Sequence, residues 1–215
     1  MAKVILFQGD SITDCDRRRN DDFYSLGFGY PTLVKAELGC KYPNEYEFHN
    51  KGVSGDKIFN VYARSAMDIF HINPDYMSIL IGVNDVWHGL DIGRNTGTER
   101  FEDLYDLMIR DIMKTMPQTK IMIMEPFALK GTATDNTENE PDRLEKFLGK
   151  TREAAAAAKR IAEKYNLVFI PLQSVFDEAC KIAPENYWLI DGVHPTAMGH
   201  HLIKTEWIKA FESIK

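Results

Sequence analysis

Short, mostly apolar runs recur along the chain, separated by longer segments in which apolar residues follow a helical period. Four runs, at 4–7, 76–81, 120–124 and 167–170, have the length expected of strands buried on both faces. Residues 46–50 alternate between apolar and polar side chains, which predicts a fifth strand. The segments between these strands predict helices at 30–38, 58–69, 101–113, 144–162, 175–182 and 202–211.

This alternation of strands and helices predicts an α/β fold. We expect a three-layer α/β/α sandwich around a five-stranded parallel sheet, in the flavodoxin-like order that five strands favour. No repeat or linker interrupts the pattern, so residues 1–215 are predicted to form a single domain. Polar stretches predict loops at 14–20, 86–97 and 130–141. Gly39 is expected to end one helix and Asp56 to cap the next.

Three predicted strands run directly into short polar blocks. These blocks are Gly9-Asp10-Ser11, Asn50-Lys51-Gly52 and Gly82-Val83-Asn84-Asp85. Because the carboxyl ends of parallel strands lie at one edge of a sheet, we expect the three blocks to converge there. A fourth block, Asp191-Gly192-Val193-His194, precedes the last predicted helix.

Ser11, His194 and Asp191 are the residue types that serine acyl transfer requires. A hydroxyl attacks a carbonyl, a histidine takes and returns the proton, and a carboxylate orients the histidine. The backbone N–H groups of Ser11 and Gly52 and the side-chain amide of Asn84 are candidate oxyanion donors. Each block alone is typical of a turn or a helix entry. Their conjunction predicts a Ser11–His194–Asp191 catalytic triad.

Composition excludes other classes of function. The formal net charge of −6 argues against a nucleic-acid partner, which requires a basic face. No apolar run has membrane-spanning length, so no membrane association is expected. The apolar run near the N-terminus is too short for a signal-peptide core, which predicts a cytoplasmic protein. Three scattered cysteines predict reduced thiols, and the histidines lack metal-ligand spacing, so no metal site is expected.

The four polar blocks, in this order, resemble those of the GDSL family of SGNH hydrolases. The four signature residues of that family would be Ser11, Gly52, Asn84 and His194. The resemblance covers nearly the whole chain. It implies the α/β/α fold predicted above and the activity of a serine esterase, lipase, thioesterase or acyltransferase, with no cofactor.

More closely, the chain is similar to intracellular acetylxylan esterases, which deacetylate xylo-oligosaccharides. The similarity lies in residues 10–15, 29–30, 50–55, 81–87 and 193–195. It implies that Tyr30 and a tryptophan next to the triad aspartate line the site. Tyr30 matches, but Ile190 precedes Asp191, and Trp188 lies two residues further back.

The predicted site loops are polar and charged and include aromatic residues, which suits a short acyl group on a sugar better than a long acyl chain. Asp10, Tyr30, Trp87 and Trp188 are the candidate substrate-binding residues, although Asp10 is also expected to hold the turn and Trp87 is equally suited to packing under its loop. We therefore expect an acetylated carbohydrate as the small-molecule substrate. A thioesterase or lysophospholipase, a sugar O-acetyltransferase and a non-catalytic sugar-binding module are the alternatives. A homo-oligomer is compatible with the sequence.

Overall fold

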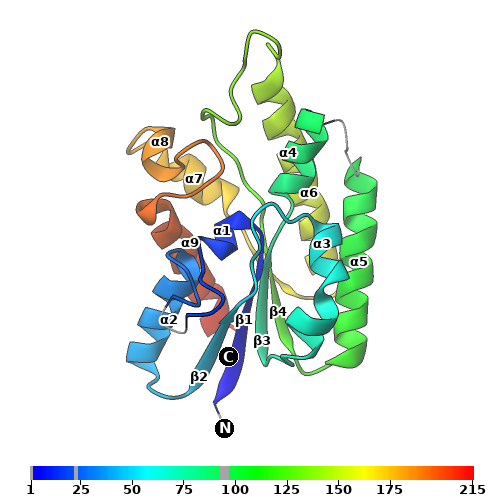
Figure 1. Ribbon diagram of the computed structural model, residues 1–215, viewed down its shortest axis with the longest axis vertical. Coiled ribbons are helices and arrows are strands. Elements are labelled where there is room, and N and C mark those ends of the chain that lie inside the picture. The colour runs from blue at the N-terminus through cyan, green and yellow to red at the C-terminus, as the bar shows by residue number, and fades with distance from the viewer. Residues whose placement is uncertain (1, 22–23, 93–96) are drawn as a thin grey trace.

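The computed structural model describes residues 2–21, 24–92 and 97–215 and shows a twisted sheet covered by helices on both faces (Figure 1). All five strands are parallel and lie in the order β2-β1-β3-β4-β5, which confirms the predicted fold class and strand order. The strands are β1 (Lys3–Gly9), β2 (Tyr46–Asn50), β3 (Tyr76–Leu80), β4 (Lys120–Met124) and β5 (Val168–Ile170).

Helices flank the sheet in two groups (Figure 1). On one side, α2 (Tyr30–Lys41) packs against α9 (Ala197–Glu212), beside the short helices α7 (Gln173–Ala179) and α8 (Glu185–Trp188). On the other side lie α3 (Ile58–Ala63), α4 (Val83–Ile92), α5 (Gly97–Thr115) and α6 (Arg143–Lys164). A four-residue helix, α1 (Ser11–Asp14), follows β1, and a π-helical turn spans Ala66–Phe70.

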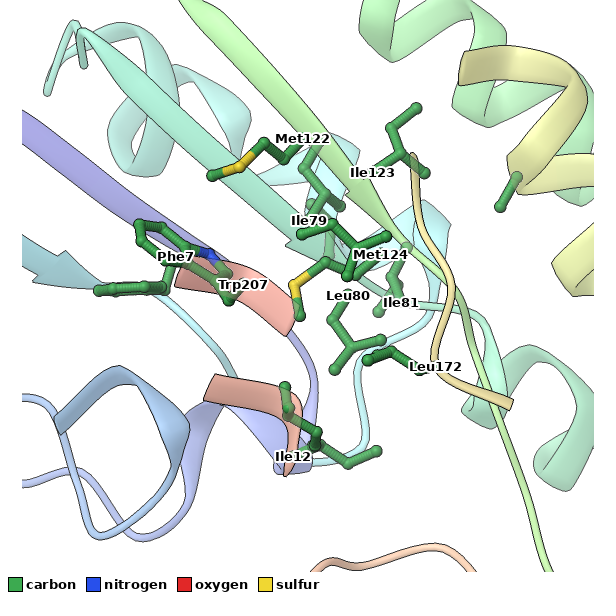
Figure 2. Packing of buried hydrophobic residues seen from close by; sticks show 14 of the residues in the cluster. Phe7, Ile12, Ile79, Leu80, Ile81, Met122, Ile123, Met124, Leu172 and Trp207 are labelled. Carbon is green, nitrogen blue, oxygen red and sulfur yellow. The ribbon is translucent and has the colours of Figure 1, made fainter. Parts of the chain in front are cut away.

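The core lies between the sheet and these two helical layers. Strand β3 is buried at all five positions, which explains why four of its five residues are apolar and its sequence does not alternate. Phe7 of β1 packs against Trp207 of α9 with ring centroids 5.3 Å apart, while β3 and β4 supply isoleucine, leucine and methionine side chains (Figure 2). This packing fixes the carboxyl end of β1, an interior strand of the sheet, two residues before Ser11.

Three local predictions were wrong. Residues 86–92 form part of helix α4 rather than a loop, because Val83, Val86, Trp87 and Leu90 share one packed face at helical spacing. Residues 93–96 of that predicted loop lie outside the described residues. Helix α2 continues past Gly39 to Lys41. Asp56 does not cap α3, whose N-cap is Lys57.

Among the described residues, no helix has both the length and the apolar character needed to cross a membrane.

Candidate active site

Ser11 lies at the first position of α1, immediately beyond the carboxyl end of β1. Asp10 caps this helix, since its Oδ1 accepts the Ile12 N–H at 3.0 Å. The Cys15 N–H donates to the Ser11 carbonyl at 2.9 Å and closes the turn. The first N–H groups of a helix have no partner within it. The turn therefore presents both the hydroxyl and the N–H of Ser11 beyond the sheet edge.

His194 and Asp191 reach this serine from the loop between α8 and α9. The Ser11 Oγ lies 2.9 Å from His194 Nε2, and His194 Nδ1 lies 2.7 Å from Asp191 Oδ2. The other carboxylate oxygen, Oδ1, accepts the N–H groups of Val193 and His194 at 2.9 and 2.8 Å. Because the carboxylate accepts from Nδ1–H, the lone pair of Nε2 faces the serine hydroxyl.

The charges of this pair follow from their contacts. Burial by itself raises the pKa of Asp191, but hydrogen bonds from the His194 side chain and from two backbone N–H groups outweigh it and hold the pKa at about 2. The hydrogen bond to Asp191 raises the pKa of His194 above its usual 6.5, against the opposing effect of burial. Asp191 is thus ionised at neutral pH and lies where its charge can stabilise an imidazolium at His194.

Backbone contacts join the two ends of the loop that carries Asp191 and His194. The Ile190 N–H donates to the His194 carbonyl at 2.8 Å, and Leu189 forms an antiparallel bridge with Pro195. Gly192 has a φ of +95°, and a Cβ there would lie 2.6 Å from the Leu129 carbonyl oxygen. Glycine is therefore required at this turn for both backbone conformation and space.

The expected oxyanion donors occupy two further strand exits. Asn84, in the first turn of α4, is buried, and its Nδ2 donates to the Asp56 carbonyl at 3.1 Å. An amide group has two N–H donors, so a second one is available. The Gly52 N–H donates to Asn50 Oδ1 at 2.8 Å within its own loop. Gly52 also packs closely against α1, since a Cβ would lie 2.4 Å from the Asp14 nitrogen.

A cavity of about 560 Å³ opens over the serine. Its walls combine carboxylates, a hydroxyl, a thiol, imidazoles and apolar groups, contributed by Ser11, Ile12, Asp14, Cys15, Asp16, Ser54, Ile190, Asp191, His194, Pro195 and His200. This volume is within the range of small-molecule sites. The hydroxyl, carboxylate and imidazole groups in this mixed wall can hydrogen-bond a substrate that carries several hydroxyl groups.

Sequence reasoning missed Cys15 and His200 as wall residues. His200 Nδ1 accepts the Tyr30 N–H at 3.2 Å, so the proton of the neutral ring is on Nε2, which lies 3.4 Å from Cys15 Sγ. Burial, aided by the charge of His194, lowers the pKa of His200 to about 4 and keeps the ring neutral. The adjacent histidines in the sequence carry no spacing signal for this contact, which depends on α9 packing beside α2.

The four expected substrate-binding residues lie behind or beside the cavity. Tyr30 is fully buried, with its hydroxyl 3.1 Å from Thr13 Oγ1, and Asp10 is 1% exposed. The Trp87 ring is half-buried, with its centroid 5.9 Å from that of His194. Trp188 donates its ring N–H to the Ala183 carbonyl at 3.2 Å. Tyr30 and Asp10 are thus buried behind the turn that carries Ser11, whereas the Trp87 ring packs near the His194 ring.

Within residues 2–21, 24–92 and 97–215, no three histidine, cysteine or carboxylate side chains are grouped so as to hold a metal ion.

Comparison with known proteins places this arrangement in a family. Residues 7–202 match the model of the GDSL-like lipase/acylhydrolase family. An acetylxylan esterase of Geobacillus stearothermophilus is 33% identical over 214 residues, covering 97% of this chain and 93% of the relative.

Solved structures agree. The crystal structure of a candidate GDSL-like lipase from Parabacteroides merdae superposes with a TM-score of 0.89 at 36% identity, covering 99% of this chain and 97% of that one. Axe2, an acetylxylan esterase from Geobacillus stearothermophilus, gives 0.84 at 29% identity, covering 97% and 93%. The chain therefore belongs to the GDSL-like lipase/acylhydrolase family and is a carboxylic ester hydrolase.

Proposed function

We propose that this protein hydrolyses acetyl esters of carbohydrates, such as acetylated xylo-oligosaccharides, through a Ser11–His194–Asp191 triad. The observation that carries the proposal is the unbroken hydrogen-bond chain from the Ser11 hydroxyl through His194 to Asp191, at a cavity whose wall includes hydrogen-bonding groups. The similarity to acetylxylan esterases over most of the chain supports the choice of an acetyl group and a sugar.

The reaction follows from this geometry. Ser11 Oγ attacks the acetyl carbonyl carbon while His194 Nε2 takes its proton, giving a tetrahedral oxyanion and an imidazolium held by Asp191. Collapse breaks the ester bond, and His194 returns the proton to the departing sugar oxygen. Water then attacks the acetyl-enzyme with His194 again as base, which releases acetate and restores Ser11.

The Ser11 N–H and the second amide proton of Asn84 are the donors we assign to the oxyanion, with the Gly52 N–H sharing its proton between Asn50 and the oxyanion. One such donor is typically worth about 3–4 kcal/mol of transition-state stabilisation.

The cavity wall also bears on the alternatives. Asp14 and Asp16 line it, and carboxylates accept hydrogen bonds from sugar hydroxyls but repel the phosphate of a lysophospholipid. Arg17, the nearest cation in sequence, is held by the Gly52 carbonyl at 2.8 Å and lies beside Asp14. The wall thus favours a neutral, hydroxyl-rich carrier of the acyl group.

The test is hydrolysis of p-nitrophenyl acetate and octanoate, and acetate release from acetylated xylo-oligosaccharides, by wild type and Ser11→Ala. We expect acetate to be preferred over octanoate and Ser11→Ala to lose at least about 1,000-fold in kcat. Ser213→Ala, at the far end of α9, is the matched control. Ser11→Ala activity within tenfold of wild type would exclude this nucleophile.

The same measurements separate the alternatives. A preference for octanoate indicates a thioesterase or lysophospholipase, and an acetylated product that depends on an added sugar acceptor indicates an acetyltransferase. Binding of the oligosaccharide without acetate release indicates a sugar-binding module.

A further inference from the structure

Arg64, at the C-terminal end of α3, binds acceptors from three separate segments. Its Nε donates to Asp56 Oδ2 at 2.7 Å, and its Nη1 donates to Asp68 Oδ2 at 2.5 Å. Its Nη2 donates to Gln8 Oε1 at 2.8 Å and lies 3.4 Å from the Gly9 carbonyl oxygen. The side chain is only 21% exposed. A planar guanidinium can hold four acceptors in fixed directions, which a lysine ammonium cannot do.

The contact of Arg64 with Asp56 connects it to Asn84, one of the proposed oxyanion donors. The Asp56 carboxylate is held by Arg64, and the Asp56 carbonyl accepts one amide proton of Asn84 at 3.1 Å. The Asp56 N–H donates to the Val53 carbonyl at 3.1 Å, so this residue is fixed at side chain and backbone. Since the Asp56 carbonyl sets the plane of the Asn84 amide, Arg64 acts on the direction of the second amide proton.

The other contacts of Arg64 lie close in sequence to the two remaining proposed donors, the N–H groups of Ser11 and Gly52. The Gly9 carbonyl lies two residues before Ser11 in the same strand exit. Asp68 is also 3.6 Å from the ammonium of Lys51, the residue before Gly52. A single cation thus contacts or pairs with segments adjacent to all three proposed donors. The π-helical turn that supplies Asp68 is a rare conformation that is frequent at functional sites.

We propose that Arg64 is a positioning residue for ester hydrolysis, which orients the Asn84 amide toward the oxyanion through Asp56. This inference rests on the proposed function, because it takes Asn84 as an oxyanion donor. The oxyanion exists in the tetrahedral transition state and not in the bound ester. Loss of Arg64 therefore lowers kcat and leaves KM nearly unchanged.

The first measurement is the kinetics of Arg64→Gln and Arg64→Lys on p-nitrophenyl acetate. We expect Arg64→Gln to lose about 10- to 100-fold in kcat, as for a donor misplaced by a fraction of an ångström, with KM within about twofold. Arg64→Lys keeps the positive charge but not the planar guanidinium, so its kcat should lie between those of wild type and Arg64→Gln. Arg160→Gln is the matched control, because Arg160 makes a similar two-bond ion pair with Glu102 on the surface of α6.

The second measurement is a double-mutant cycle with Asn84→Ala. If Arg64 acts through Asn84, Arg64→Gln in the Asn84→Ala background costs less than about threefold in kcat. A loss that is equal in both backgrounds, or a rise in KM at constant kcat, would overturn the inference. Should Arg64→Gln fail to fold, Arg64→Lys completes the same cycle.

Inactivation by a fluorophosphonate separates this inference from the proposed function. The phosphoryl oxygen occupies the oxyanion hole when Ser11 Oγ attacks phosphorus, so the inactivation rate should follow the kcat pattern whatever the natural ester is. A wild-type enzyme that neither hydrolyses acyl esters nor reacts with the fluorophosphonate refutes the proposed function and this inference with it. If wild type reacts but the losses caused by Arg64→Gln and Asn84→Ala multiply independently, only the proposed role of Arg64 is refuted and the proposed function stands.

Discussion

Asp10 is a carboxyl group in an apolar setting, directly behind the proposed nucleophile. It is 1% exposed; Oδ1 accepts the Ile12 N–H, whereas Oδ2 is buried without a partner among the described residues. Burial raises its pKa from the usual 3.8 to about 7, although the Ile12 N–H and the charge of His194 oppose the shift. The informative perturbation is Asp10→Asn, which keeps the shape and the cap and removes the titration.

The magnitude follows from the two pKa values. The folded-state pKa is raised above the unfolded one, so the stabilisation is complete below pH 3.8 and is lost as pH rises through about 7. Between pH 5 and pH 8, wild type loses about 2–3 kcal/mol of unfolding free energy through this group. In Asp10→Asn, a buried amide N–H takes the place of Oδ2 and costs about 1–3 kcal/mol at every pH.

The assay is urea-induced unfolding of both proteins at pH 5 and pH 8, followed by tryptophan fluorescence. All other groups titrate equally in wild type and Asp10→Asn, so the difference between their unfolding free energies changes with pH through Asp10 alone. From pH 5 to pH 8 this difference should move by about 2–3 kcal/mol in favour of Asp10→Asn. Asp177→Asn, at an exposed carboxylate, is the matched control. A difference that stays constant between the two pH values would refute the reasoning. The KM for p-nitrophenyl acetate should stay within about twofold, since this carboxyl faces no substrate; a tenfold rise would restore it as a binding residue.

Two further predictions concern the loop that carries His194. Since Asp191 raises the pKa of His194, kcat/KM should fall as pH drops through a value above 6.5, and Asp191→Asn should move that fall to lower pH while reducing kcat by about 10³- to 10⁴-fold. A pH profile whose acidic limb is unmoved in the variant would contradict this. Gly192→Ala should lose about 1–3 kcal/mol of stability in thermal unfolding and lower kcat, because φ is +95° and the added Cβ meets the Leu129 carbonyl. A wild-type Tm and kcat in that variant would be evidence against strain at this turn.

The parts of the fold that could be predicted are those that depend on the local order of apolar and polar residues. Mostly apolar runs identify the buried parallel strands, and the polar residues that follow β1 and β3 mark the sheet edge where the site lies. Helix α4 was missed because polar residues, among them Asn84, Asp85, His88 and Asp91, are interspersed with its apolar ones. The spacing of Val83, Val86, Trp87 and Leu90 contained the helical signal, since these positions are three, four and seven residues apart.

What could not be predicted depends on side chains brought together from distant segments. Tyr30 was expected to face the substrate, yet the packing of α2 on the sheet turns its ring into the core. The contact between Cys15 and His200 joins residues 185 positions apart, and the four bonds of Arg64 join β1, the loop before α3 and the π-helical turn. No local period encodes such contacts, because they are set by tertiary packing.

The placement of Asp191 and His194 in one bridged loop has a consequence for how the enzyme is assembled. Three hydrogen bonds to Asp191 from within the loop fix the proposed acid and base relative to each other, independently of the sheet. The Ser11–His194 hydrogen bond connects this loop to the turn that carries Ser11. Displacement of the loop as a unit would separate His194 from the proposed nucleophile while leaving the Asp191–His194 pair intact. The proposed triad therefore depends on how this loop is held against the turn that carries Ser11, which includes its hydrogen bonds from Leu129 and Ala133 to the carbonyls of Gly192 and Asp191.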